Sequence, residues 1–268
     1  MVTVNSNYSA SFAANAAKQT QADLNSAMEK LSTGKRINFA KDDAAGTALA
    51  MRLDSEISGL AVASRNASDG QSLIDTADGA LKESHSMLVR MRELAVQAQN
   101  GTLQSADVTA LGVEFDALNN EITRISDNTT WAGLKILDGS LASGISFRVG
   151  ASDNITHAIA NMATTAIGVL AANTVDHANT ITNLDTAIGN ISQERAKLGA
   201  VSNRLDSTVA NLDQIRVNLT ASKGRIEDAD FAQETGNLAK SQILQQAATA
   251  MVAQANASKS TVLTLVQS

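Results

Sequence analysis

The sequence predicts a mainly α protein: an elongated antiparallel helical bundle or coiled coil, with a small β-hairpin region in the middle of the chain. Three observations support this prediction. Apolar residues repeat at 3-4 spacing from Ile181 to Leu219, a pattern held for more than five heptads. The 268 residues include no proline, which ends or kinks helices. Hydrophobic residues make up 44% of the chain but aromatic residues only 3%, so the expected core is aliphatic.

The longest apolar pattern predicts one long helix that needs a partner. At roughly 1.5 Å per residue, this helix would be about 60 Å long, which exceeds the width of a compact domain. A coiled-coil seam of that length must pack against helices of similar length. The pattern therefore predicts a rod. Its positions are Ile181, Leu184, Ile188, Ile191, Arg195, Leu198, Ser202, Leu205, Val209, Leu212, Arg216 and Leu219.

Composition excludes several classes of protein. The absence of cysteine excludes disulfides, thiolate metal sites and thiol nucleophiles. A net charge of −6 argues against nucleic acid as the main partner. No apolar run approaches the ~20 residues of a membrane span. Residues 1–7 lack the basic and apolar regions of a secretory signal peptide, so export would need another route.

The first predicted helix covers residues 3–32. It is rich in small and polar residues, and its larger apolar residues, Leu24, Met28 and Leu31, share one helical face. Alanine contacts bury little area, so this helix is expected to be marginal alone. Gly34 is the expected end of the helix.

A charged joint at residues 38–43 precedes a second long helix. Asp42 or Asp43 is expected to cap that helix, which is predicted over residues 44–99. Asn100-Gly101 predicts a turn. The third helix is predicted over residues 105–127, and the short connection favours antiparallel return packing.

The middle of the chain has a different pattern. Residues 145–149 alternate apolar and polar side chains, as a half-buried strand does, and residues 153–159 could add a second strand. We therefore expect a β-hairpin region at about 134–159. Residues 160–177 are ambiguous and are interpreted as a loop that leads into the next long helix, predicted over 178–222.

The C-terminal part repeats the N-terminal layout in reverse order. Residues 222–230 form a second joint with a glycine, basic residues and then acids. The last segment, residues 231–268, is again rich in Ala, Gln and Ser. Weak terminal helices on a rigid rod predict ordering upon assembly into a filament. The apolar face of the last segment includes Leu238, Leu244, Ala248 and Met251.

Longer motifs at the two ends resemble one family closely. The N-terminal motifs are residues 31–46 (LSTGKRINFAKDDAAG), 64–70 (SRNASDG) and 92–98 (RELAVQA); the C-terminal motifs are residues 222–234 (SKGRIEDADFAQE) and 241–247 (SQILQQA). Together they resemble bacterial flagellin, over about residues 1–150 and 178–268. The resemblance is specific because the long motifs stand at opposite ends in the right order.

The resemblance implies a structural subunit that polymerises into the bacterial flagellar filament for swimming motility. Residues 1–43 and 223–268 would supply the joint and the inner coiled-coil core domain, and residues 44–222 the rod domain. Large outer domains would be absent. The subunit would be secreted through the flagellar type III export apparatus with a secretion chaperone, and would meet hook-associated and cap proteins in the extracellular flagellum. No cofactor is expected.

Three groups of residues are predicted to carry these interactions. The self-assembly group holds Leu24, Met28, Leu31, Leu238, Leu244, Ala248 and Met251; the inter-domain joint holds Arg36, Asp42, Asp43, Arg225, Glu227 and Asp228; the group matching the hot spot of the vertebrate flagellin receptor holds Arg90, Leu94 and Glu114.

Other classes of protein remain as alternatives to the filament subunit. A hook–filament junction protein would share the flagellin-like ends. A signalling hairpin of the chemoreceptor type would also be long and helical, but the β-like middle and the missing membrane span argue against it. An enzyme is least expected. His85, His157 and His177 lack the spacing of a zinc motif, and the acid pairs are expected to cap helices or form ion pairs.

Overall fold

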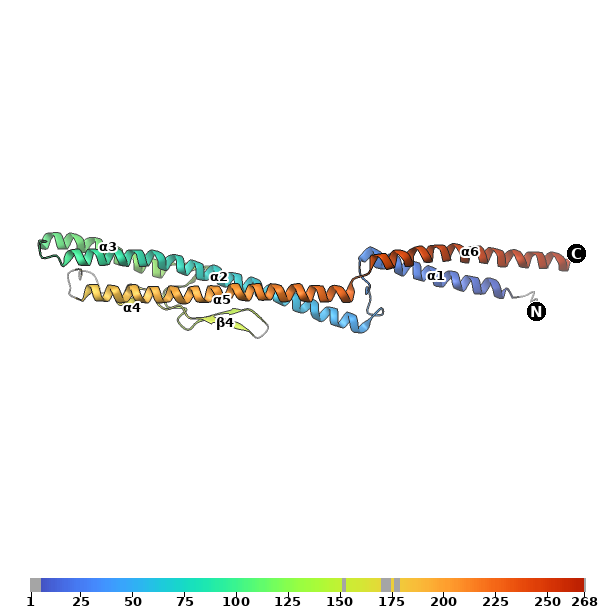
Figure 1. The fold of residues 1–268 in the computed structure, drawn as a ribbon, viewed down its shortest axis with the longest axis horizontal. Coiled ribbons are helices and arrows are strands. Elements are labelled where there is room, and N and C mark those ends of the chain that lie inside the picture. Colours follow the sequence, from blue (N-terminus) through green and yellow to red (C-terminus); the bar gives the residue numbers. More distant parts are fainter. Residues whose placement is uncertain (1–5, 151–152, 170–174, 176–178, 268) are drawn as a thin grey trace. The chain divides into compact units, whose positions relative to one another are not determined.

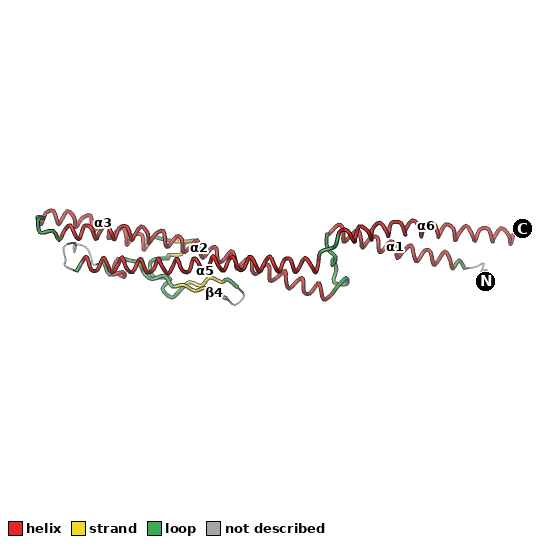
Figure 2. The backbone as a smooth tube through the Cα atoms, viewed as in Figure 1, coloured by secondary structure: helices red, strands yellow, loops and turns green. Residues whose placement is uncertain are grey.

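The computed structural model describes residues 6–150, 153–169, 175 and 179–267, with side chains described as far as Ser258. The predicted fold class is confirmed: the chain is 76% helical, a helical bundle with a small β region. The described part contains six helices and two antiparallel sheets of two strands each (Figures 1 and 2).

The five helices expected from the sequence appear in the predicted order, and a sixth, short helix lies within residues 160–177, where a loop is expected. They are α1 (Tyr8–Thr33), α2 (Ala44–Ala98), α3 (Ser105–Asn128), the short α4 (Thr164–Ile167), α5 (Thr180–Glu227) and α6 (Phe231–Gln267). α5 ends later than predicted, because it continues past residue 222 and through Gly224 to Glu227. A single glycine in a helix costs only about 1 kcal/mol, and the ion pair of Lys223 with Asp54 holds this turn in place. Part of the ambiguous 160–177 segment lies outside the described residues.

Contacts between residues divide the chain into two units. The first holds residues 1–56 and 218–268, and the second holds residues 57–217. The first unit contains α1, α6 and the segments that join them to α2 and α5. The second contains most of α2 and α5, all of α3 and α4, and both sheets.

The core of the second unit lies among α2, α3 and α5. Leu81, Leu88 and Met91 of α2 are fully buried, together with Phe115 and Ile122 of α3. The small residues of α2 at the same spacing are buried too, which lets the neighbouring helices approach closely. Large and small residues therefore alternate along the buried face of α2.

One side of the predicted α5 seam is shifted by one residue. Leu184, Ile191, Leu198 and Leu205 are buried as predicted, but the intervening buried positions are Ala187, Glu194 and Val201 rather than Ile188, Arg195 and Ser202. Arg195 instead lies at the flank of the seam, where it makes a bidentate ion pair with Asp78 of α2. Its Nε donates to Oδ1 at 2.7 Å and its Nη2 donates to Oδ2 at 3.2 Å. A guanidinium can reach a carboxylate from there without being buried.

The β region forms two hairpins and begins earlier than predicted. β1 (Thr130–Trp131) pairs with β2 (Leu134–Lys135), and β3 (Ile145–Arg148) pairs with β4 (Asn154–His157). Gly133 with φ 83° and Ala132 with φ 50° make the first turn. Two-residue strands carry almost no alternation, so sequence patterning could not detect the first hairpin.

The β3–β4 hairpin packs closely on α2. Phe147 of β3 is buried against Gly70, where an added Cβ would lie 2.7 Å from the ring. Asn66, one turn earlier on α2, donates a side-chain hydrogen bond of 3.1 Å to the carbonyl of Arg148. Position 70 must therefore lack a side chain for the hairpin to dock as it does.

Candidate self-assembly surface and joint

Helices α1 and α6 lie side by side and pair through small residues (Figure 1). Ala13, Thr20 and Ala27 are buried at intervals of one heptad on α1, and Ser241 and Ala248 are buried at the same interval on α6. Small side chains in a seam allow two backbones to come close, but they bury little apolar area. The pair is therefore a weakly stabilised coiled coil.

The predicted self-assembly residues separate into two sets. One set lies in the seam between α1 and α6 and is buried or half-buried: Leu24, Leu31, Leu238 and Ala248. The other set is exposed on the outer faces: Met28, Leu244 and Met251. Sequence periodicity places residues on a helical face but does not say which of two apolar faces meets the partner helix.

Sequence reasoning missed other exposed apolar residues of the same pair. Tyr8 and Phe12 of α1 are 85% and 73% exposed, and Phe231 and Ile243 of α6 are 67% and 66% exposed. Aromatic residues make up only 3% of the chain, so aromatics on otherwise polar helices were a signal that could have been used. Large apolar side chains that a helix pair leaves outside are typical of a surface that another chain covers.

The joint links the chain's two end segments through the backbone. Lys35 and Asp228 form an isolated antiparallel bridge. Beside it, the Arg36 N–H donates to the Glu227 carbonyl at 2.6 Å, and the Ala229 N–H donates to the Gly34 carbonyl at 2.9 Å. These bonds connect residues almost two hundred positions apart, so α1 and α6 leave the joint in a defined register.

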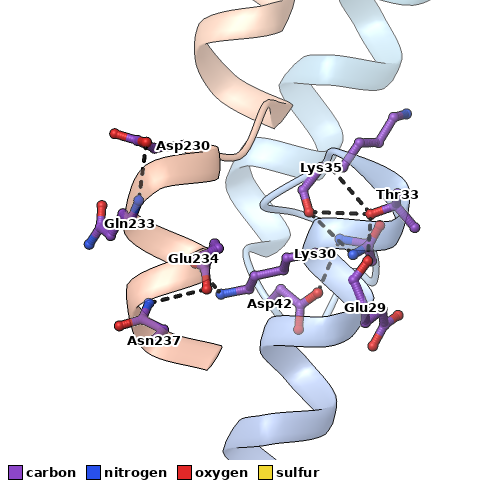
Figure 3. Close-up of polar contacts among 10 residues, drawn as sticks. Glu29, Lys30, Thr33, Lys35, Asp42, Asp230, Gln233, Glu234 and Asn237 are labelled. Atoms are coloured by element: carbon purple, nitrogen blue, oxygen red, sulfur yellow. Dashed lines mark hydrogen bonds and ion pairs between the residues drawn. The ribbon is translucent and has the colours of Figure 1, made fainter. Parts of the chain in front are cut away.

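Ion pairs surround this bridge. Lys35 pairs with Glu227 at 3.1 Å. Lys30 of α1 reaches Glu234 of α6 at 3.5 Å, as Figure 3 shows. Lys223 forms an ion pair with Asp54. The hydrogen bond from Lys223 is the main cause that lowers the pKa of the Asp54 carboxyl, and the positive charge of Lys223 is the second. The first unit therefore has charge pairs on both sides of the joint.

The two predicted capping residues have different roles. The Asp43 Oδ1 accepts a hydrogen bond from the Gly46 N–H at 2.8 Å and so caps α2. The Asp42 Oδ2 accepts from the N–H groups of Phe39 and Asn38 at 2.9 and 3.1 Å. These bonds, that of Phe39 above all, lower the pKa of the Asp42 carboxyl. Asp42 therefore folds the 38–42 turn rather than starting the helix.

The joint arginines bond to neutral groups. The Arg36 Nη2 donates to the carbonyl of Ile226 at 2.7 Å, and the Arg225 Nη2 donates to the Ser222 hydroxyl at 2.9 Å. The Oδ2 of Asp228 lies only 2.7 Å from the position that a Cβ on residue 224 would take, so a side chain there would collide with this carboxylate. Arg36 thus bonds from one segment of the joint to the other, and Gly224 leaves room for the Asp228 carboxylate.

The predicted receptor residues lie together in the second unit but differ in exposure. The Arg90 Nε donates to the Glu114 Oε1 at 2.9 Å, and its Nη1 donates to the Glu93 Oε2 at 3.1 Å. The hydrogen bond to Glu114, then that to Glu93, raises the pKa of Arg90. Leu94 lies in the core and is 1% exposed. A partner could therefore touch the Arg90–Glu114 pair, but not Leu94 in this conformation.

No three histidine or acidic residues in the described part of the chain gather as a metal site would need. Among the described helices, none has the length and apolar character to cross a membrane.

Comparison with known proteins points the same way as the fold. The N-terminal helical region of bacterial flagellin matches residues 4–142, and the C-terminal helical region matches residues 181–266. A flagellin of Halalkalibacterium halodurans is 43% identical over 90% of this chain and 91% of its own length. A flagellin of Bacillus subtilis is 39% identical with the same coverage.

Solved structures agree. The crystal structure of Bacillus cereus flagellin is 34% identical with a TM-score of 0.50, over 55% of this chain and 88% of that chain. A candidate flagellar hook-associated protein from Vibrio parahaemolyticus has a TM-score of 0.60 over 70% of this chain and 100% of its own. At 14% identity, that likeness shows the fold alone.

The helical fold, together with the matches at both ends of the chain, defines a structural protein that assembles into a filament. This chain belongs to the bacterial flagellin family. It is a structural subunit that polymerises into the flagellar filament, which is extracellular, and it is not an enzyme. The hook–filament junction alternative is not favoured.

Proposed function

We propose that the paired helices α1 and α6 form the inner core of the flagellar filament through their exposed apolar side chains. The observation behind this proposal is how the side chains of the pair are distributed. Small residues pack in the seam between the two helices, while the large apolar side chains of Phe12, Met28, Ile243 and Met251 remain exposed. Burying them against neighbouring subunits would gain roughly 1.5–3 kcal/mol per large side chain. That gain offsets the weakness of the isolated pair.

The same reasoning supports the domain assignment. We propose that residues 1–43 and 223–268 provide the joint and the core domain, and that residues 44–222 provide the rod domain. The boundaries between the two units defined by residue contacts lie instead within α2, after residue 56, and within α5, after residue 217. Arg36 and Glu227 would hold the two parts of the core domain in register through the bonds described above, and Asp43 would start α2 beside them.

Seeded polymerisation followed by electron microscopy tests the assembly surface. Full-length protein should form long filaments, and a chain lacking residues 1–32 and 233–268 should not. Ile243→Glu should remain soluble with unchanged helix content but fail to polymerise. Gln242→Glu adds the same charge at the neighbouring exposed position, and it should polymerise. Filaments from Ile243→Glu at the wild-type critical concentration would exclude this face from the contact.

Assembly outside the cell requires partners before and after export. We propose that the subunit leaves through the flagellar type III export apparatus, and that a secretion chaperone holds its C-terminal segment beforehand. The exposed Phe231, Ile243 and Leu244 of α6 are apolar groups that such a chaperone would cover. Hook-associated and cap proteins would meet the ends of the filament. Co-purification of the export chaperone with the full-length chain, but not with one lacking 233–268, tests this step.

We also propose recognition of the monomer by the vertebrate flagellin receptor, centred on Arg90 and Glu114. Both side chains are about half exposed, and together they present a charge pair on α2 and α3. Leu94 would support α2 from the core. A receptor-reporter assay should show loss of signalling with Glu114→Arg, whereas Leu94→Met should signal almost normally. Strong signalling by Glu114→Arg would contradict this assignment.

A further inference from the structure

The turn between α2 and α3 contains an Asn-Gly pair that the filament function leaves unexplained. Asn100-Gly101 is the only such pair in the sequence. Both residues are exposed and lie outside regular helix. The Thr102 N–H donates to the Asn100 side-chain Oδ1 at 3.3 Å. This bond folds the asparagine side chain over the following peptide group, as in an Asx-turn.

We propose that Asn100 is a site of spontaneous covalent modification, an intramolecular deamidation. The backbone nitrogen of Gly101, after losing its proton to base, attacks the Asn100 Cγ and forms a five-membered succinimide. The Cγ–Nδ2 bond breaks and Nδ2 leaves as ammonia with one added proton. Water then opens the ring at either carbonyl. The net reaction consumes one water, releases one ammonia and leaves aspartate or isoaspartate at position 100.

Three features of the turn favour this reaction. The bond from the Thr102 N–H restrains the Asn100 side chain over the Gly101 peptide group, which lowers the entropic cost of ring closure. The same N–H stabilises the negative charge that develops on Oδ1 in the tetrahedral intermediate. Gly101 has no Cβ to obstruct the approach. Among the described turns and caps, the Gly101 N–H donates no backbone hydrogen bond, so deprotonation breaks no such bond.

The modification would change the charge and the path of the chain at one place. A carboxylate at position 100 stands just beyond the C-terminal end of α2, where the helix dipole disfavours negative charge. Isoaspartate also adds a methylene group to the main chain between α2 and α3. Subunits in an old filament would therefore differ from new ones at this turn.

Peptide mapping of aged full-length protein tests the proposal. After incubation at mildly alkaline pH, the tryptic peptide of residues 93–124 should gain the mass expected for conversion of an amide to an acid. Fragmentation should place the gain at Asn100, with separate aspartate and isoaspartate forms. Asn120 provides a control within the same peptide, because it is exposed but lies inside α3.

A matched variant distinguishes the mechanism. Gly101→Ala meets open space and should keep the fold, as an unchanged melting curve would confirm. It should reduce modification at Asn100 to the level of Asn120. The proposal is overturned by equal rates at Asn100 and Asn120 in the wild type, by an aspartate product without isoaspartate, or by an unchanged rate in Gly101→Ala.

Discussion

At the scale of single residues, the contact between Gly70 and Phe147 is a tight packing constraint between two elements. The ring of Phe147 occupies the space that a side chain at position 70 would need. Glycine has a lower helix propensity than alanine. Its lack of a side chain, however, allows the β3–β4 hairpin to dock on α2.

We therefore expect Gly70→Ala to lower the free energy of unfolding. Overpacking should cost about 1–3 kcal/mol, and the gain in helix propensity of about 1 kcal/mol offsets only part of that. Gly79→Ala on the same helix is the control, because a Cβ there meets open space. It should stabilise the protein by roughly 0.5–1 kcal/mol. Urea unfolding followed by circular dichroism measures both; equal stabilisation by the two variants would contradict a close contact at Gly70.

A second prediction at this scale concerns His157 of β4. Its Nε2 lies 3.9 Å from the Oε1 of the buried Glu194, which also accepts from the Ala160 N–H at 3.4 Å and pairs through Oε2 with Lys197 at 3.1 Å. Burial is the main cause that lowers the pKa of His157; the charge of Lys197 acts in the same direction, and that of Glu194 opposes both.

A lowered pKa means that the folded protein binds this proton less readily than the unfolded chain does. The resulting stabilisation is fully present above pH 6.5 and is lost as the pH falls from there through the folded pKa. Urea unfolding above and below pH 6.5 should show this loss. His157→Gln, which keeps a polar side chain but does not titrate, should remove that part of the pH dependence; an identical slope in the variant would exclude His157 as its source.

At the scale of elements, the antiparallel pair of α2 and α5 combines an apolar seam with a polar flank. Asp78 bonds to Arg195, Arg92 pairs with Asp185 at 2.6 Å, and Gln71 bonds to Asp206. The residue numbers rise along α2 while they fall along α5, as an antiparallel register requires. The polar pairs at the flank therefore form in only one alignment of α5 along α2, while the buried leucines supply most of the stabilisation.

We expect these two contributions to differ in size and in response to salt. Asp78→Asn breaks a partly exposed pair and should cost no more than about 1 kcal/mol, with less effect at high salt. Leu81→Ala creates a cavity at a fully buried position and should cost about 2–5 kcal/mol at any salt concentration. Thermal unfolding at low and high salt measures both costs. A larger cost for Asp78→Asn than for Leu81→Ala would reverse this ranking.

At the scale of the whole molecule, the joint couples the conformation of one chain end to that of the other. Gly34 is central to it. It ends α1 in the left-handed conformation with φ 70°, and its carbonyl accepts from the Ala229 N–H. A change at Gly34 should therefore affect α6 as well as α1.

We expect Gly34→Ala to impair polymerisation although no contact surface is altered. A left-handed alanine costs roughly 1–2 kcal/mol, and a loss of 1.4 kcal/mol corresponds to about tenfold in an equilibrium constant. The critical concentration of seeded filaments should rise by about that factor, with faster hydrogen exchange at Ala229. Gly236→Ala on α6, where a Cβ meets open space, is the control. Normal polymerisation by Gly34→Ala would show that the joint does not control the chain ends.

Much of this molecule follows from local sequence rules. The 3-4 spacing and the absence of proline predict long helices, because helix periodicity is a property of neighbouring residues along the chain. Gly34 and Asp43 end one helix and start the next through bonds to residues within four positions. The flagellin-like motifs at the two ends identify the family without any coordinates.

Other features depend on residues that are distant in sequence. Only the packed structure shows that Glu194 rather than Arg195 is buried in the α5 seam, that Leu24 lies in the seam while Met28 lies outside, and that Leu94 is covered. A helix of the right period can rotate by one residue without breaking a local rule. Which side chains are then buried is decided by the partner helix, through the volume and polarity that it offers.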